Sequence, residues 1–448
     1  MHARRPETFD FAGFTLLPRE RLLLDGASAV PLTGRAFDLL VALVRRAGSL
    51  AHKDELLDEV WAGLTVEEVN LSVNISLLRK ALGQRRPGER MIETVAKTGY
   101  RFVCPVRPRL GAPSYPTPLD APSGQGRAPA SPQARRAYLE GRYDWNRRSE
   151  EGLTAAIASF RRAVAEDPDF ALAYAGLADC YAALGYLSHR APAESFPMAR
   201  GYAEMALERD PTLAEPHASL AYVKFYFDWD WAAADAAYRT ALARQPEWAA
   251  AHQWYSILLL AVGRPHAAIA EIMTACEREP LSLSINTDLG FHYYYTGQYA
   301  EAAKQLQSVL AMQSDFAPAQ LWLGRTYQEL GECDAALAAF RAVEAAASEW
   351  PVAVAARGFV EGMAGRGEEA AATLAQLHRL AGRRFVTPYG IALVEAGLGR
   401  DEAALATLET AFAERSHWLV WLRLDPRWRG LRAHPRFGQI VARMRFPE

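Results

Sequence analysis

Cysteine is scarce in this chain of 448 residues. The four cysteines, Cys104, Cys180, Cys276 and Cys333, lie far apart, and no Cys-x-x-Cys pair occurs. This spacing indicates neither a zinc site nor a disulfide framework, and scattered thiols suit a reducing cytosol. We therefore expect a cytoplasmic protein that carries no metal and no cofactor.

Long apolar runs are absent as well. The longest apolar stretch, residues 257–262, is far too short to span a bilayer. Residues 1–6 lead into no apolar segment of the kind that makes a signal peptide. The sequence therefore predicts neither a membrane span nor secretion.

Catalytic motifs are missing from the chain. It contains no G-x-x-x-x-G-K-[ST], H-E-x-x-H or G-x-S-x-G sequence, and none of its ten histidines lie four residues apart. We expect that the protein is not an enzyme. An acidic and aromatic cluster at residues 228–231 is either a ligand contact or a turn packed between helices.

The net charge is small but unevenly distributed. The chain has 50 Lys and Arg against 52 Asp and Glu, a formal balance of −2. Residues 76–109 carry nine basic and two acidic side chains, a local balance of +7, whereas residues 110–448 have a balance of −6. A basic patch confined to one small module suits contact with phosphates. The alternative is an ordinary solvated charge run.

The most informative stretch is residues 66–102. Its apolar positions with helical spacing are Leu71, Ile75, Leu78 and Leu82. Gly83 is expected to end this helix. Two strand-like runs follow, residues 91–95 and 100–104, and the connection between them has its glycine, Gly99, placed late, as suits a hairpin turn.

Two further helices and a small sheet are expected before this stretch. Residues 9–25 are rich in Phe and Leu and predict a short antiparallel sheet. Thr33 is placed to cap a helix whose buried stripe begins at Phe37. A second helix would bury Leu56 and Val60.

The order of helix, basic loop, strand, turn and strand resembles a winged helix of the OmpR/PhoB type, the output domain of bacterial response regulators. Residues 75–82 (ISLLRKAL), 92–95 (IETV) and 99–102 (GYRF) carry the resemblance. It covers roughly the first quarter of the chain, and we place the domain at residues 9–106. The resemblance implies that the helix enters the major groove of DNA while the hairpin wing touches the minor groove or the backbone.

The resemblance also implies a set of DNA-binding residues. They are Trp61, Asn70, Val73, Asn74, Ser76, Leu77, Arg79, Lys80, Thr94, Lys97, Tyr100 and Arg101. Asn can read adenine, and Val or Leu can touch a thymine methyl group. Packing is the alternative for Trp61 and for the wing residues. Family members often carry arginine where Val69, Ser76 and Leu77 stand, so their target sequence does not transfer. The loop after Trp61 can meet RNA polymerase in this family.

Beyond residue 106 the composition changes twice. Eight of the 26 prolines fall within residues 105–132, so we predict a linker at residues 107–134. After it, glycines and alanines recur every 34 residues: Gly263, Gly297, Gly331, Gly365 and Gly399, with Ala268, Ala302, Ala336, Ala370 and Ala404. This period resembles the tetratricopeptide repeat and implies about eight helix pairs over residues 135–416.

The repeat resemblance implies a concave groove that binds a protein, a peptide or a small ligand. The expected groove residues are Tyr222, Phe225, Phe291, Tyr294, Arg325, Gln328 and Tyr389. The alternative is that these side chains only pack between repeats. Residues 417–448 break the period and are expected to form a C-terminal capping helix.

The sequence therefore predicts a multidomain fold, a small α+β winged helix followed by an all-α tetratricopeptide superhelix. The leading functional hypothesis is a bacterial transcriptional regulator that binds double-stranded promoter DNA, as a homodimer on repeated half-sites, and receives a signal through its repeats. The alternative is a scaffold or adaptor whose winged helix contacts protein, which the mostly neutral recognition helix favours.

Overall fold

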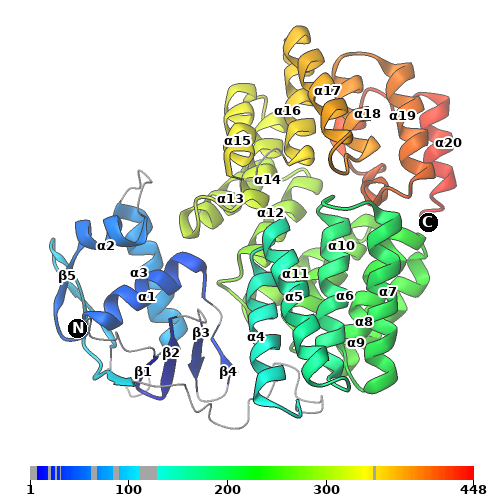
Figure 1. The fold of residues 1–448 in the computed structure, drawn as a ribbon. Coiled ribbons are helices and arrows are strands. Elements are labelled where there is room, and N and C mark those ends of the chain that lie inside the picture. The colour runs from blue at the N-terminus through cyan, green and yellow to red at the C-terminus, as the bar shows by residue number, and fades with distance from the viewer. Residues whose placement is uncertain are drawn as a thin grey trace. The chain divides into compact units, whose positions relative to one another are not determined.

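The computed structural model describes residues 8–18, 22–25, 28–30, 32–61, 68–83, 90–109, 129–346 and 350–447. The chain divides into two compact units, one containing residues 1–124 and the other most of residues 125–448 (Figure 1). The loop that follows Trp61 and most of the expected linker lie outside the described residues.

A five-stranded antiparallel sheet forms one layer of the N-terminal unit. Its order is β4-β3-β2-β1-β8. The strands are β1 (Thr8–Phe11), β2 (Phe14–Leu17), β3 (Leu22–Asp25), β4 (Ser28–Ala29) and β8 (Arg107–Arg109). The early sheet is thus confirmed. The expected start of the linker at residue 107 is wrong, because β8 pairs with β1 and belongs to this sheet.

Three helices and a second small sheet complete this unit. They are α1 (Gly34–Arg45), α2 (Lys53–Val60) and α3 (Glu68–Leu82), with β5 (Leu50–His52), β6 (Ile92–Val95) and β7 (Gly99–Phe102). The Thr33 side chain accepts a hydrogen bond from the Ala36 amide and caps α1, as predicted. The second sheet has the order β5-β7-β6, so a strand between α1 and α2 joins the expected hairpin.

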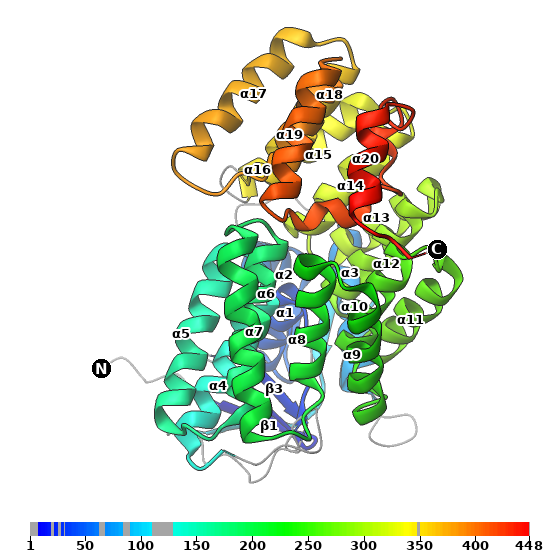
Figure 2. The same cartoon turned by 90° about the vertical axis from the view of Figure 1, so that its right-hand side faces the viewer.

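The second unit is built from helices that follow one another as antiparallel pairs (Figures 1 and 2). Within the described residues these make eight pairs, as predicted: α4 (Pro132–Asn146) and α5 (Glu150–Glu166), α6 (Ala171–Tyr186) and α7 (Pro192–Arg209), α8 (Glu215–Val223) and α9 (Trp231–Arg244), α10 (Ala249–Ala261) and α11 (Pro265–Arg278), α12 (Leu283–Tyr295) and α13 (Tyr299–Met312), α14 (Ala317–Glu329) and α15 (Cys333–Ala346), α16 (Pro351–Met363) and α17 (Gly367–Ala381), α18 (Pro388–Gly397) and α19 (Asp401–Ala413).

Four shorter elements complete the helical unit. A π-helical turn, η1 (Lys224–Asp228), extends α8, and two 3-10 turns follow α19, η2 (His417–Trp421) and η3 (Pro426–Trp428). The last helix, α20 (Pro435–Arg443), packs beside α19 (Figure 2). In the described part of the chain, no helix combines the length and the apolar character needed to cross a lipid bilayer.

The 34-residue period has a direct structural cause. Each periodic glycine lies in the turn between the two helices of a pair and has a positive φ, between 71° and 82°, which favours glycine. Each periodic alanine is completely buried. Small side chains at these positions let the paired helices approach closely.

Close approach also fixes glycines inside helices. A Cβ added to Gly324 in α14 would lie 2.5 Å from the Phe340 ring of α15. We expect Gly324→Ala to lower the free energy of unfolding of the helical unit by about 1–3 kcal/mol, because the added methyl overpacks this contact. Urea denaturation followed by circular dichroism measures it.

Gly201 in α7 provides the matched control, because a Cβ added there meets no atom within 4 Å. Gly201→Ala should leave stability unchanged or raise it by up to about 1 kcal/mol, as alanine favours the helix. Equal effects of the two substitutions would contradict the packing argument.

Candidate nucleic-acid interface

Helix α3 is seated on the core of the N-terminal unit by the four predicted apolar side chains. Leu71, Ile75, Leu78 and Leu82 are all buried in a cluster that also holds side chains of α1 and α2. Gly83 follows with a φ of 61°, and the helix ends there as expected. The opposite side of α3 is therefore held outward by packing alone.

The outward side of α3 is mostly neutral. Val69 is 61% exposed and is the first apolar side chain on it. The DNA-binding candidates of this helix that are exposed or half-buried are Asn70, Val73, Ser76, Leu77, Arg79 and Lys80. Among them only Arg79 and Lys80 carry charge, so the helix offers few strong groups for base edges.

Asn74 does not lie on this outward side, and its expected exposure is wrong. Its side chain is 0% exposed, and Nδ2 donates a hydrogen bond of 2.9 Å to the Asn70 carbonyl oxygen. Helical periodicity puts position 74 beside Ile75 and Leu78 on the core boundary. The side chain closes a local backbone contact instead of facing a groove.

Arg79 joins α3 to the hairpin. Its Nε and Nη2 donate to the Ile92 carbonyl oxygen at 3.2 and 3.0 Å, and Nη2 also donates to Thr94 Oγ1 at 2.7 Å. The planar guanidinium therefore spans from the helix to β6 and fixes the wing beside it. Arg79 is a positioning residue here, and direct contact with DNA remains a prediction.

The hairpin tip presents Lys97. Lys97 is exposed and has a φ of 63°, so the left-handed residue of the turn is lysine. Gly99 has another role than the one expected, because a Cβ there would lie 2.0 Å from the Ala51 carbonyl oxygen. The glycine is required for the approach of β5 to β7, and assigning it to the turn was wrong.

Two aromatic candidates are buried. Trp61 and Tyr100 both lie in the core cluster of the N-terminal unit, and the Tyr100 hydroxyl is 3.4 Å from Ser72 Oγ at the base of the outward side. Arg101 in β7 lies 3.5 Å from Glu93 in β6. Burial favours the packing alternative for Trp61 and Tyr100.

The cations of this unit fall into two groups. Lys53 pairs with Glu68 at 2.6 Å, and this hydrogen bond raises the pKa of Lys53. In contrast, the exposed Lys80, Arg90 and Lys97 have no ion-pair partner among the described residues. These three side chains, from the helix, the loop and the wing tip, are the ones best placed to meet an anionic backbone.

The Arg79 contact can be tested through the wing. Arg79→Met should speed amide hydrogen exchange in β6 and β7 about 10-fold or more, because hydrogen bonds from a charged group contribute about 1.5–3 kcal/mol. Lys80→Met on the same helix should leave these amides unchanged. Equal exchange in both variants would show that Arg79 does not hold the hairpin.

The expected groove residues of the helical unit are mostly covered. Tyr222, Phe225, Phe291, Tyr294, Arg325 and Tyr389 are buried, and only Gln328 is half-buried. Much of the cover comes from residues 417–428. The Phe291 ring meets the Trp421 ring edge to face at 4.9 Å, and the Arg325 guanidinium lies between Trp322 and Trp418.

Residues 417–428 therefore do more than cap the last repeat. They contact first helices of several pairs, from Tyr186 in α6 to Tyr389 in α18. Burial and the nearby Arg427 lower the pKa of Arg325 to about 10, so it stays charged at neutral pH.

The burial of the expected groove residues under this segment favours the alternative that they only pack. The off-phase aromatics of this segment were the only sequence signal for it.

A buried polar cluster holds this segment. The Tyr389 hydroxyl donates to Asp425 at 2.7 Å and accepts from Trp428 Nε1 at 2.7 Å, and Arg427 pairs with Asp425 at 2.6 Å. Burial acts to raise the pKa of Asp425, but Arg427 and these hydrogen bonds outweigh it and hold the pKa below its ordinary value.

We expect Tyr389→Phe to destabilise the helical unit by about 1–3 kcal/mol at pH 7, because it leaves a buried carboxylate and an indole N–H short of a partner. A depressed carboxyl pKa stabilises above the unfolded pKa of about 3.9 and loses this contribution as pH falls. The effect should therefore shrink below about pH 4. Thermal denaturation over pH measures it.

Tyr143→Phe serves as the control, since the Tyr143 side chain is only half-buried and its hydroxyl makes no hydrogen bond with another described residue. A loss as large as that of Tyr389→Phe, or a loss independent of pH, would contradict the role of the Asp425 cluster.

Comparison with known proteins assigns a class to each unit. The family described as "Transcriptional regulatory protein, C terminal" matches residues 27–102, and a tetratricopeptide repeat family matches residues 294–357. The N-terminal unit is a winged helix of the OmpR/PhoB type, and the helical unit contains tetratricopeptide repeats.

Curated relatives match about a fifth of this chain. "Transcriptional regulator HilA" of Salmonella typhimurium is 35% identical over 91 residues, 20% of this chain and 16% of HilA. "Phosphate regulon transcriptional regulatory protein PhoB" of Escherichia coli is 32% identical over 99 residues, 21% of this chain and 42% of PhoB. The chain thus spans less than half the length of these relatives.

Solved structures are similar to parts of the chain. The DNA-binding domain of E. coli CadC is 29% identical, with 24% of this chain and all of that chain covered and a TM-score of 0.22. Pseudomonas aeruginosa pilF is 20% identical, with 51% of this chain and 99% of that chain covered and a TM-score of 0.35.

Proposed function

We propose that this protein is a cytoplasmic, non-enzymatic transcriptional regulator that binds double-stranded promoter DNA through α3 and the β6–β7 hairpin. The observation that carries the proposal is the shape of this surface. A helix is held outward by its buried stripe, and a wing is fixed beside it by Arg79. This is the arrangement that docks a helix in a major groove.

Charge supports a mode of binding dominated by the DNA backbone. Lys80, Arg90 and Lys97 are exposed around the helix and wing, whereas the helix centre offers Ser76 and Val73. Phosphate contacts position a protein, and base contacts specify the sequence. We infer that one winged helix alone discriminates poorly, and that a pair on repeated half-sites supplies specificity.

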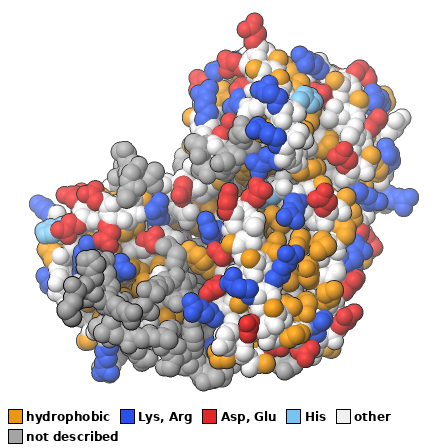
Figure 3. Space-filling model, in the orientation of Figure 1, with side chains coloured by type: hydrophobic (Ala, Val, Ile, Leu, Met, Phe, Trp, Pro, Cys, Tyr) orange, Lys and Arg blue, Asp and Glu red, His pale blue; other side chains and the backbone are white. Residues whose placement is uncertain are grey.

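The helical unit is proposed to receive the signal, from a protein or a small ligand. The covered positions Phe291 and Tyr389 argue against a peptide lying along the first helices. On the face in view in Figure 3, basic and acidic side chains are interspersed over the helical unit. A partner is therefore expected at a local site. Contact of the winged helix with RNA polymerase is part of the same proposal.

The alternative function is an adaptor whose winged helix binds protein. The exposed Val69 and the neutral centre of α3 favour it. The two functions differ in salt dependence, because an apolar protein contact releases few counterions.

The test titrates the full chain with duplex DNA from its own upstream region at several salt concentrations. The slope of log affinity against log salt should be about −0.9 per phosphate contact. Lys80→Ala and Lys97→Ala should each reduce the slope by about one contact. Lys304→Ala, an exposed lysine of α13, is the control and should change nothing.

A flat salt dependence, or no binding at low salt, would contradict DNA binding and leave the adaptor. Loss of slope in the Lys304 variant alone would place the DNA surface on the helical unit and would also contradict the proposal.

A further inference from the structure

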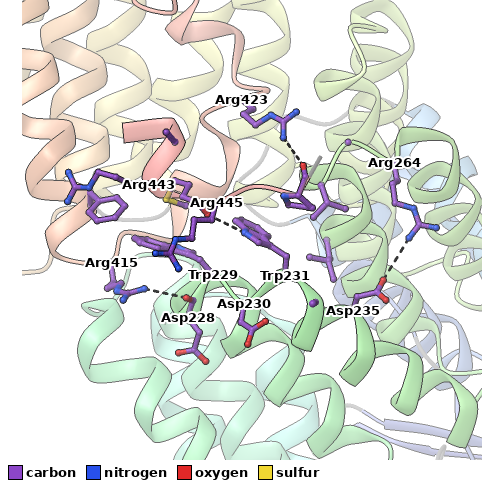
Figure 4. A pocket seen from close by; sticks show the side chains of 18 residues that line it. Asp228, Trp229, Asp230, Trp231, Asp235, Arg264, Arg415, Arg423, Arg443 and Arg445 are labelled. Atoms are coloured by element: carbon purple, nitrogen blue, oxygen red, sulfur yellow. Dashed lines mark hydrogen bonds and ion pairs between the residues drawn. The ribbon is translucent and has the colours of Figure 1, made fainter. Parts of the chain in front are cut away.

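A cavity of about 1340 Å³ opens in the helical unit between segments far apart in sequence (Figure 4). Its walls are residues 228–235, the turn between α10 and α11, and residues 412–447. The C-terminal residues are tied to the third helix pair, because Trp231 Nε1 donates to the Met444 carbonyl oxygen at 3.2 Å. The Trp231 ring also stacks on Phe446 at 4.9 Å.

Cations dominate the lining of this cavity. Its arginines are Arg264, Arg415, Arg423, Arg443 and Arg445, and its carboxylates are Asp228, Asp230 and Asp235. All five arginines are exposed. They come from four places in the chain, so the grouping is a product of folding and not of a local charge run.

Each of the three carboxylates has a partner other than Arg415, Arg423, Arg443 and Arg445. Arg200, which does not line the cavity, donates to both oxygens of Asp228 at 2.7 Å. Asp230 accepts from the Ala233 amide and caps α9. Asp235 pairs with Arg239 at 2.9 Å.

Neutral groups, in contrast, orient most of the cavity's arginines. Arg415 donates to the carbonyl oxygens of Phe227 and Asp228, and its guanidinium lies over the Trp229 ring at 4.5 Å. Arg423 donates to the Pro447 carbonyl oxygen. These contacts hold a guanidinium without cancelling its charge.

Arg443 and Arg445 have even less compensation. Arg443 lies over the Phe412 ring at 3.8 Å. Neither arginine has an ion pair with another residue that the structure describes. Among the residues described around the cavity, Arg264 is the arginine that pairs with a lining carboxylate, Asp235, at 3.9 Å. The cavity therefore keeps an excess of positive charge.

Backbone conformation adds an independent observation. Arg415 has a φ of 56° and Arg445 a φ of 50°, each just after a helix. Glycine is the residue usually found in this left-handed position after a helix, because a side chain is disfavoured there. The chain carries arginine at both positions, and both side chains line the same cavity.

We propose that this cavity binds a small polyanion of the phosphate class, such as a nucleotide or another organic phosphate. Guanidinium groups form paired hydrogen bonds with phosphate oxygens. Several guanidinium groups of this cavity are not paired with a carboxylate of any residue that the structure describes. A bound anion would bridge the third helix pair and the C-terminal segment. Its role as the signal rests on the proposed regulatory function, whereas the binding itself needs no DNA.

The test is isothermal titration calorimetry of the full chain, without DNA, against pyrophosphate and against ATP. Arg445→Gly should weaken binding at least 10-fold while the melting temperature stays equal or rises, since glycine suits the left-handed backbone. Arg443→Ala should also weaken binding. Arg379→Ala, an exposed arginine of α17 outside the cavity, should bind like the wild type.

Absence of heat with both probes at millimolar concentration and low salt would overturn the site. Equal affinity of the Arg445→Gly, Arg443→Ala and wild-type chains would do the same. Binding of poly-glutamate in place of both phosphates would overturn the phosphate class. Lys80→Ala should retain pyrophosphate binding and Arg445→Gly should retain DNA binding, so failure of either site can be told apart from failure of the other.

Discussion

The contact between the Arg79 guanidinium and β6 is the constraint on which the proposed DNA-binding surface depends. A helix on a small core can present an outward side by burial alone, but a winged surface also needs the hairpin at a fixed place beside it. Arg79 supplies this through the Ile92 carbonyl and Thr94. Arg79, which its position in the helix would assign to DNA contact, thus holds the hairpin in place, whereas the neighbouring Lys80 is exposed.

In the helical unit the corresponding constraint is the small side-chain volume that the close contact between paired helices allows. Completely buried alanines and left-handed glycines repeat every 34 residues, so each pair packs in the same way. Residues 417–428 then fill positions that a peptide would otherwise use, anchored by Asp425 and Arg427. A signal of the kind that we propose would therefore act at another surface, and the arginine cavity lies where the C-terminal segment meets the third helix pair.

Local sequence pattern predicted what depends on local geometry: α3 and its end at Gly83, the hairpin, and eight helix pairs. It failed where distant segments meet. β8 lies in a proline-rich stretch, yet it pairs with β1. Gly99 is required because the Ala51 carbonyl oxygen of β5 leaves no room for a Cβ there. Asn74 looked exposed because a polar residue at the edge of an apolar stripe gives no sign of its burial. The arginines of the cavity do not recur at a regular spacing in the sequence, so no sequence pattern indicates that they lie together.

The most direct measurement of the central claim is site-specific photo-crosslinking of the full chain to duplex DNA. A crosslinker replacing Ser76 on the outward side of α3 should react with bases in the major groove, and one replacing Lys97 at the wing tip should react with the backbone or the minor groove. Crosslinks from neither position, under conditions where the chain retains bound DNA, would contradict the account.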